Sequence, residues 1–458
     1  MLNLIWLGLI LASVLLGGFT GRIDAVGSGA IDNAKNGVIL AGNLLAVMTL
    51  WLGMMRLATE AGLVHKLGRA LRPALSWLFP EIPKGHPALG AITMNFAANL
   101  LGLDNAATPL GLRAMEELQS LNPNPTVATN AMCMLLAMNT SNLTLIPTTV
   151  IAVLISVHAR NPTAIIAPTL LATAIAHAAA IGAAKLLENS RAYRLKALAA
   201  AAPPKPDPAL AAPPQARSPE AHAGLLFERA EAAEDRLRPM VRGGRLALLG
   251  AGLVFLAMLA ITAFPELLGR PVAPDESARF GLWRLLDGLS KLAIPWLVLI
   301  FPLYAALRRV PVYETFVEGA REGFGVAVRI IPYIVGMFVA IGMLRASGGM
   351  DMLGALLRPA AHLASIPPEI LPMALIRPFS SAAALGVLGD IARHYPPDSL
   401  PVLIGATLYG CSETTFYVIA VYFGAVNIRK TRHAIPAGIV ADVICPLAAV
   451  IVCNAMFA

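Results

Sequence analysis

The chain has 458 residues, of which 57% are apolar and only 14% are charged, and its mean hydropathy is +0.69. Ordinary soluble domains carry about 25% charged residues, so this chain has too few polar side chains to cover a set of soluble domains. Its apolar residues come in blocks of about 17–25, the length that crosses ~30 Å of hydrocarbon. The composition therefore predicts an all-α polytopic membrane protein. The net charge of +8 lies in loops between the blocks, where it sets topology, so no nucleic-acid partner is expected.

Nine apolar blocks are predicted to span the membrane, and polar residues interrupt two of them. No basic residue precedes the first block, which favours a retained membrane helix over a cleaved signal peptide. Two amphipathic stretches, 62–79 and 350–365, are each followed by a segment rich in glycine and proline, 86–119 and 369–394. These segments are predicted to be re-entrant hairpins, whose backbone survives in a bilayer only when protein buries it. The predicted spans are 3–18, 36–57, 126–157 (interrupted), 163–187, 246–264, 289–307, 323–345, 399–424 (interrupted) and 434–457.

Residues 188–245 form the only long hydrophilic stretch, an Ala/Pro-rich linker followed by a short charged helix. Basic residues cluster at both of its ends, so the positive-inside rule places it in the cytoplasm. Counting spans from this linker puts the N-terminus in the cytoplasm, the C-terminus outside, and the basic segment 427–433 inside, as the same rule requires. We therefore expect a first membrane repeat at 1–187, the linker at 188–245 and a second repeat at 246–458, in a bacterial inner membrane.

The chain repeats itself, because GLVHKLGRALRP at 62–73 matches GGMDMLGALLRP at 348–359. A Gly-Met-x-Arg motif precedes each copy, ending at Arg56 and Arg345, and Pro-Glu-Ile follows each copy. The predicted topology gives the two copies opposite orientations. Inverted repeats with paired hairpins and broken helices are typical of secondary transporters, whose site lies near the bilayer midplane.

Motifs of other chemistries are missing. No Walker loop, GxSxG, HExxH or GxGxxG motif occurs, so neither ATP-driven transport nor hydrolysis is expected. The chain is not expected to be an enzyme, and no cofactor is expected beyond Na⁺ or H⁺ as a coupling ion. Four cysteines lie in apolar segments without a CxxC pair and are predicted to be free thiols with no metal site: Cys133, Cys411, Cys445 and Cys453.

In the first copy, the candidate site residues are polar side chains that hydropathy places inside the membrane, where such groups need a reason. Gly102 and Pro109 allow a turn in the first hairpin, and Pro147 releases a backbone carbonyl in the interrupted helix. Amide oxygens and free carbonyls can bind a cation or a polar solute. The alternative is that these side chains only join helices. The candidates are Asn99, Asp104, Asn105, Thr108, Asn139, Ser141 and Asn142.

In the second copy, Glu413 lies in mid-helix between apolar residues and is, with Asp104, the candidate for binding the coupling ion. Arg377 precedes a stretch of small residues, and a guanidinium near half-helix amides suits an anionic or carbonyl-bearing solute. The alternatives are a structural Arg377–Glu413 ion pair, or an Arg377 that snorkels to the outer surface. Asp390 is expected at the interface and Asp442 as a buried partner. Further candidate contacts are Ser380, Ser381, Ser412 and Thr415.

Longer motifs in each half carry a family resemblance. The first half contains NLIW at 3–6, FPEIP at 79–83, NAATPLG at 105–111 and LIPTTVIAV at 145–153. The second half contains VPVYETFVEGAREG at 310–323, TTFYV at 414–418 and VYFGAV at 421–426. On these motifs the chain resembles a fusion of spore maturation proteins A and B, which belong to the nucleoside-recognition (Gate) domain family. The resemblance implies a fold like that of the related concentrative nucleoside transporters, with re-entrant hairpins in an inverted repeat.

Three functions remain open at this point. The first is an ion-coupled secondary transporter or exporter of a small polar solute, which includes anionic ones, with Arg377 binding the anionic group. The second is a translocator of a lipid or lipid-linked intermediate, whose headgroup would enter a groove between the amphipathic helices. The third is a membrane scaffold or regulator that docks partners through the linker. The expected partners are the lipid bilayer, a small-molecule or lipid substrate and, by analogy with relatives, further copies of the chain.

Overall fold

Nearly all of the described chain is helical. The structure, a computed structural model, describes residues 2–83, 86–102, 104–190, 193, 240–241, 243–269, 281–352, 355–356, 359 and 366–457. Within these ranges, a single isolated bridge between Val127 and Lys430 is the only β-type pairing. Six helical stretches of the same ranges are long and apolar enough to cross a membrane. The predicted all-α class is therefore confirmed, while most of the predicted linker and of the amphipathic stretch 350–365 lies outside the described residues.

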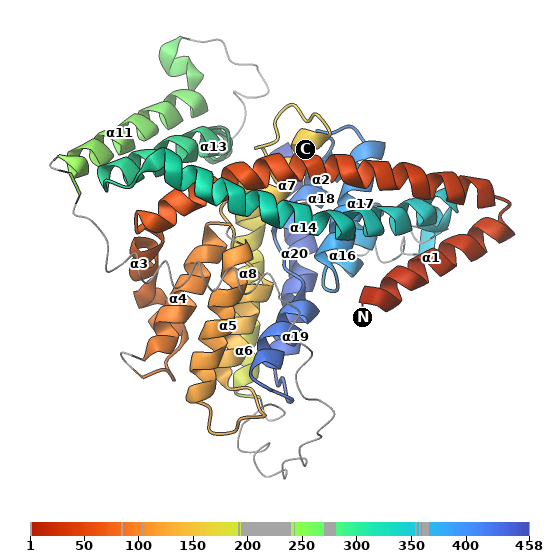
Figure 1. The fold of residues 1–458 in the computed structure, drawn as a ribbon, viewed down its shortest axis with the longest axis horizontal. Helices are drawn as coiled ribbons and strands as arrows, with labels where there is room; N and C mark the ends of the chain where they lie inside the picture. Colours follow the sequence, from red (N-terminus) through yellow and green to blue (C-terminus); the bar gives the residue numbers. More distant parts are fainter. Residues whose placement is uncertain are drawn as a thin grey trace.

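The helices follow the same order in both halves (Figure 1). In the first half they are α1 (Leu2–Phe19), α2 (Ile23–Glu60), α3 (Leu63–Leu78), α4 (Pro87–Leu100), α5 (Asp104–Ser120), α6 (Asn130–Thr140), α7 (Thr148–Ser156) and α8 (Ile166–Glu188). In the second they are α11 (Gly244–Ala263), the 3₁₀ turn η2 (Pro265–Leu268), α13 (Gly281–Leu307), α14 (Val312–Ala346), α16 (Leu371–Ile376), α17 (Ser381–His394), α18 (Leu400–Gly410), α19 (Thr415–Ala425) and α20 (Ala434–Phe457).

The predicted repeat is visible in this order of elements. The long helix α2, the hairpin α4–α5, the interrupted pair α6–α7 and the helix α8 reappear as α14, α16–α17, α18–α19 and α20. Both predicted interruptions are confirmed, at residues 141–147 and 411–414. Each of the two glycine- and proline-rich segments contains two helices joined by a short connection, after Leu100 in the first and at residues 377–380 in the second. Whether the hairpins turn back within a bilayer stays a prediction.

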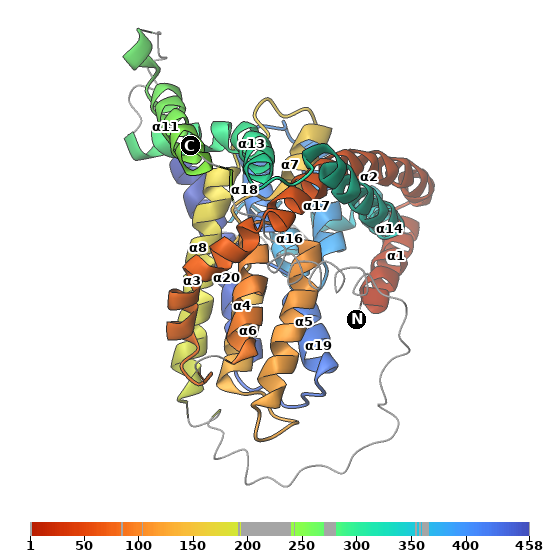
Figure 2. The same ribbon diagram turned by 60° about the vertical axis from the view of Figure 1, so that its left-hand side comes forward.

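The two long helices lie side by side and run in opposite directions (Figure 1). Glycines let their backbones approach closely, as is common between membrane helices. A Cβ on Gly319 would lie 2.6 Å from the Leu52 carbonyl oxygen, and one on Gly37 would lie 3.0 Å from the Val335 Cα. The pair thus links the two halves of the chain along most of the length of both helices. The helices α4, α5, α6, α8, α19 and α20 stand upright and mostly below the pair (Figure 2).

This close approach predicts the effect of adding one methyl group. Gly319→Ala is expected to lower the free energy of unfolding by about 1–3 kcal/mol, because the new Cβ meets backbone atoms that cannot move independently. Gly325→Ala is the matched control on the same helix, because a Cβ there meets nothing within 4 Å. We expect the control to be neutral or stabilising, since alanine favours helix over glycine. Unfolding titrations in detergent check both, and equal stabilities of the two variants would contradict the packing described here.

The ends of α2 and α14 differ from the prediction. Both helices extend well beyond the predicted spans 36–57 and 323–345. The predicted spans are too short because polar residues in the extensions lower the hydropathy there. Some polar residues of the extensions, such as Asn33 and Glu322, contact the partner helix. A Cβ on Gly342 would fall 2.1 Å from Asn33, and Arg56 pairs with Glu322 at 2.7 Å. Contacts between the two helices, which hydropathy does not report, explain the extra length.

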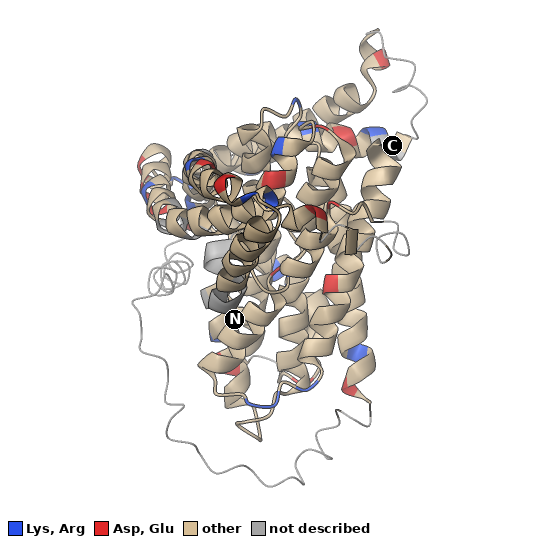
Figure 3. Ribbon diagram, turned by 90° about the vertical axis from the view of Figure 1, so that its right-hand side faces the viewer, with Lys and Arg blue, Asp and Glu red and all other residues tan. Residues whose placement is uncertain are grey.

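The outer surface of several helices is apolar. On α11, Leu246, Leu249, Leu253 and Leu256 are each more than half exposed. Charged residues gather near the ends of the upright helices and in loops, and are sparse along the middle of these helices (Figure 3). A surface of this kind needs lipid rather than water around it. The chain is therefore a multi-pass membrane protein.

Several contacts join segments that are distant in the sequence. On the side predicted to be cytoplasmic, Arg56 pairs with Glu318, and the Ala128 amide donates to the Lys430 carbonyl at 3.0 Å. On the opposite side, the Arg160 amide donates to the Asp398 carboxylate. Each contact joins segments that the predicted topology places on the same side of the membrane.

Candidate functional site

The two interruptions meet at the centre of the molecule. The Glu413 amide, in the second break (residues 411–414), donates to the Thr140 carbonyl beside the first break (residues 141–147) at 3.0 Å. A Cβ on Gly410 would lie 3.1 Å from Pro147, and one on Gly438 of α20 would lie 2.6 Å from Thr415. Gly410 thus lets the two breaks approach closely, and one backbone hydrogen bond joins them.

Each hairpin turn is fastened to the break of its own repeat. In the first copy, the Leu145 amide donates to the Leu100 carbonyl at 2.9 Å, and a Cβ on Gly102 would lie 2.8 Å from the Ile146 carbonyl oxygen. Gly102 also has φ of +72°, a conformation that favours glycine. In the second copy, the Phe416 amide donates to the Pro378 carbonyl at 3.1 Å. Two hairpin turns and two breaks therefore form one junction.

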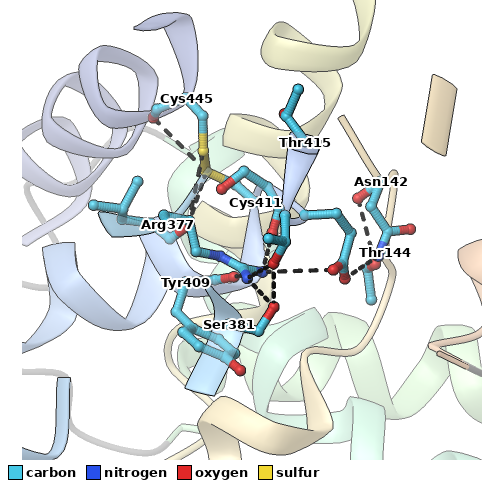
Figure 4. Close-up of polar contacts among 12 residues, drawn as sticks. Asn142, Thr144, Arg377, Ser381, Tyr409, Cys411, Thr415 and Cys445 are labelled. Atoms are coloured by element: carbon cyan, nitrogen blue, oxygen red, sulfur yellow. Dashed lines mark hydrogen bonds and ion pairs between the residues drawn. A yellow bond between two sulfur atoms is a disulfide. The ribbon is translucent and has the colours of Figure 1, made fainter. Parts of the chain in front are cut away.

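Arg377 braces the second hairpin turn against the second break (Figure 4). Its side chain is 4% exposed, and its guanidinium lies over the Tyr409 ring at 4.4 Å from the ring centroid. It donates to Ser381 at 2.6 Å and to Thr414 at 3.5 Å, and to the carbonyls of Tyr409 and Ser412. The alternative in which Arg377 snorkels to the outer surface is therefore wrong, since Arg377 is buried and bonded within the protein.

Glu413 reaches across to Asn142 of the first repeat. Its Oε1 accepts from the Asn142 amide at 3.1 Å, and its Oε2 lies 3.9 Å from a guanidinium nitrogen of Arg377. Asn142 is buried, and within the described residues its Oδ1 has no hydrogen-bond partner. The Glu413 side chain is 30% exposed, so one face of its carboxylate is open to a proton, an ion or a solute. The predicted Arg377–Glu413 ion pair is present but long.

Three buried asparagines form a separate cluster. Asn139 accepts from Asn99 at 2.9 Å and donates to Asn95 at 3.0 Å, and Asn95 donates to the Ala107 carbonyl at 2.7 Å. Tyr422 of α19 donates to the same Asn139 oxygen at 3.4 Å. These amides bond to one another and hold α4, α5, α6 and α19 together. For Asn99 and Asn139 the contacts therefore match the helix-joining alternative.

The other predicted site residues have varied positions. Ser141 contacts His177, and Thr415 donates to Asp442 at 3.0 Å, so Asp442 has a partner within the protein as predicted but is only half-buried. Ser380 caps α17 by accepting from the Ala383 amide at 3.1 Å. Thr108 of α5 lies beside the Tyr422 hydroxyl. The side chains of Asp104 and Asn105 lie outside the described residues.

Two predictions outside the site need correction. Cys411 and Cys445 are joined in a disulfide, so the prediction of free thiols is wrong for this pair, while Cys133 and Cys453 are free and buried. Packing of α18 against α20 brings the two sulfurs together, and nothing in their sequence spacing reveals it. Asp390 is buried and pairs with Arg345 rather than lying at the interface.

Three residues of the junction were missed by sequence reasoning: Tyr409, Tyr422 and His177. Each lies in an apolar helix and looks like part of its packing surface. The available signal was the repeat itself, because Tyr409 precedes the second break at the place where Asn139 precedes the first. Aligning the two copies position by position would have drawn attention to Tyr409 as the counterpart of Asn139.

Comparison with known proteins gives the family. A nucleoside-recognition (Gate) model matches residues 41–156 and 327–429, which contain both hairpins and both breaks. Spore maturation protein B of Bacillus subtilis is 43% identical over 173 residues, 38% of this chain and 97% of that protein. Spore maturation protein A of the same species is 42% identical over 181 residues, 40% of this chain and 92% of that protein.

A more distant relative is the inner membrane protein YjiG of Escherichia coli, which is 33% identical over 85 residues, 18% of this chain and 56% of that protein. No solved structure matches the chain at a significant level. The matches to two separate spore maturation proteins, each covering part of the chain, agree with the fusion that the sequence motifs suggest. The chain therefore belongs to the spore maturation protein family and carries the nucleoside-recognition Gate domain in two segments.

Proposed function

We propose that this chain is an ion-coupled secondary transporter or exporter of a small polar solute across the inner membrane. The observation that carries the proposal is the junction of two breaks and two hairpin turns from opposite repeats. Broken helices expose backbone amides and carbonyls within the membrane, and transporters use such groups to bind ions and solutes. The cytoplasmic placement of the N-terminus and of residues 188–245 belongs to the same proposal.

Glu413 is the proposed coupling residue. A carboxylate inside a membrane protein is costly unless it binds a proton or a cation or is paired. Its Arg377 partner lies 3.9 Å away, beyond hydrogen-bond distance, and part of the carboxylate is open. Asn142 of the other repeat donates to the same carboxylate, so an ion bound to Glu413 would change a contact between the two halves.

The solute is proposed to bind beside this carboxylate, with Asn142 and Ser381 as neutral contacts. Asn142 has an unused buried amide oxygen within the described residues, and Ser381 is partly exposed beside Arg377. A guanidinium, a carboxylate and amide groups together suit a solute that both donates and accepts hydrogen bonds. Nucleosides belong in the test panel because the matching family model is described as nucleoside recognition.

Transport by reconstituted protein tests the proposal. In proteoliposomes with a panel of nucleosides, nucleotides, carboxylates and sugars, wild type is expected to accumulate a solute when a Na⁺ or H⁺ gradient is applied. Glu413→Gln should reduce this accumulation at least about tenfold. The amide keeps the shape of the side chain, but it takes up no proton and has no negative charge to pair with a cation. Solute exchange without a gradient should persist.

Glu266→Gln is the matched control, because Glu266 pairs with Arg284 near η2, away from the junction. It should transport like wild type. Full gradient-driven accumulation by Glu413→Gln would contradict the assignment of Glu413 as the coupling residue.

A further inference from the structure

His177 lies buried near the middle of α8 and contacts two of the segments that form the junction. Its Nδ1 is 2.8 Å from the Ser141 hydroxyl, in the first break, and its side chain is among the buried polar groups. Phe96 of the first hairpin stacks on the ring, with centroids 5.5 Å apart and planes 29° apart. The imidazole therefore joins the first break to the first hairpin.

The ring can take up one proton. The Ser141 hydroxyl lies 2.8 Å from the Ala137 carbonyl oxygen and 2.8 Å from the His177 Nδ1, and it has only one hydrogen to donate. Where it donates to the carbonyl, Nδ1 carries the N–H of the contact; where it donates to the ring, Nδ1 is the acceptor. In either arrangement, one nitrogen of the neutral ring has a lone pair that can bind a proton.

This ring is connected to the proposed coupling residue by two adjacent side chains. Ser141 contacts His177, and the next residue, Asn142, donates to Glu413. One ionisable side chain of each repeat is thus attached to the same dipeptide in the first break. A movement of this dipeptide would change the surroundings of both.

The second repeat has a covalent bond at the corresponding place. Ser141 and Cys411 are the C-terminal caps of α6 and α18, and their partners, His177 and Cys445, lie near the middle of α8 and α20. The disulfide fastens the second break to α20, while a hydrogen bond fastens the first break to α8. Of the two fastenings, the hydrogen bond is the one that includes a group able to take up a proton.

Charged groups on the neighbouring helices have other partners. In α4 there is no ionisable side chain, in α6 there is the Cys133 thiol, and in α18 there is Tyr409, which lies against Arg377. The ionisable groups of α13 and α20 are Arg284, which pairs with Glu266; Asp287 and Lys291, which pair with each other; Tyr304, under Lys66; Asp442, bonded to Thr415; and the cysteines Cys445 and Cys453. A proton on His177 would meet a hydroxyl and an aromatic ring rather than a carboxylate.

We propose that His177 is a proton-binding site of this chain, and that proton binding there releases the first break from α8. A buried imidazolium without a counter-charge is costly, and the cost falls if the break opens to water or to an anionic solute. Opening therefore increases the affinity of the ring for a proton, and by linkage a proton favours opening. The inference rests on the proposed function only in making H⁺ a coupling ion.

Hydrogen exchange measures the release without any solute. The full chain in nanodiscs is exchanged between about pH 5 and 8, the range in which histidines titrate. Rates for peptides covering residues 139–147 are corrected for the intrinsic pH dependence of amide exchange. Each pKa unit by which opening raises the proton affinity of His177 increases corrected exchange by up to about tenfold once the pH falls below both pKa values. Corrected exchange in wild type should therefore rise as the pH falls.

Two variants keep the test decisive. His177→Gln and His177→Asn can bond to Ser141 but take up no proton in this range, and both should give corrected rates that do not depend on pH. His394→Gln is the control, because that ring is half exposed and lies beside Asp390. Burial and the nearby Arg432 lower the pKa of His433 to about 4, so a transition near neutral pH does not arise from His433.

Unchanged pH dependence in both His177 variants, or its absence in wild type, would overturn the proposal. The outcome is independent of the transport assay. A pH-dependent release together with full activity of Glu413→Gln would retain the proton site and reject Glu413 as coupling residue. No release together with inactive Glu413→Gln would do the reverse.

Discussion

Replacing Arg377 with methionine is expected to lower the free energy of unfolding by about 3–5 kcal/mol, the usual cost of removing one partner from a buried charged network. The guanidinium donates hydrogen bonds to two hydroxyls and two carbonyls, and these bonds join the second hairpin turn to the second break. Without it, the carbonyls of Tyr409 and Ser412 lose their donor where water is scarce. Denaturant titration of the purified protein in detergent gives the difference.

The contribution of the Glu413 charge can be separated from the bracing. Glu413 lies 3.9 Å from the guanidinium, so adding Glu413→Gln to Arg377→Met should recover little stability. Arg160→Met is the matched control, because only the backbone amide of Arg160 bonds to Asp398 and its side chain is exposed. The control should change stability by less than about 0.5 kcal/mol. Full recovery in the double variant would show that ion pairing, rather than bracing of the break, holds Arg377 in place.

Replacing Arg56 with methionine is also expected to lower the free energy of unfolding by about 3–5 kcal/mol, because it removes one partner from a buried group of ion pairs. Its side chain is 6% exposed and pairs with Glu60 at 3.1 Å, Glu318 at 3.1 Å and Glu322 at 2.7 Å. Removing the guanidinium leaves three carboxylates close together where α2 meets α14. The loss is measured in the same unfolding titration.

Two further substitutions define the cause. Adding Glu322→Gln should recover part of the loss, because the shortest of the three pairs then leaves no buried charge behind. Lys35→Met on the same helix is the control, since Lys35 and Asp32 are 70% and 68% exposed and such pairs contribute about 0–1 kcal/mol. An Arg56→Met variant as stable as the control would contradict a structural role for the cluster.

The backbone plan of the site could be predicted from sequence because its signals are local. Gly102, Pro147 and the polar residues of the breaks interrupt apolar periodicity where the structure has its turns and interruptions. The repeated Gly-Met-x-Arg motif identifies the corresponding helices of the two halves. These features depend on backbone geometry and hydropathy, which a sequence carries residue by residue.

The side-chain partners could not be predicted, because they are set by packing between distant segments. Asn99 and Asn139 bond to each other, and only the fold shows this. Tyr422 reaches Asn139 because Gly111 leaves room for its hydroxyl, a pairing across the two halves of the chain. The disulfide has the same origin. Hydropathy also misplaced Asp390, since its partner Arg345 belongs to another helix.

The most direct test of the central claim is ligand binding at the junction. Thermal unfolding of wild type, Glu413→Gln and Glu266→Gln is followed with nucleosides, nucleotides, carboxylates, sugars and lipid headgroups, while Na⁺ and pH are varied. A ligand at 100 times its Kd stabilises the folded state by about 2.7 kcal/mol, which is readily measured. A water-soluble polar ligand is expected to raise the midpoint of wild type and of Glu266→Gln but not of Glu413→Gln. A shift produced by anionic lipids alone, or an equal shift in Glu413→Gln, would contradict it and favour a lipid translocator or a scaffold.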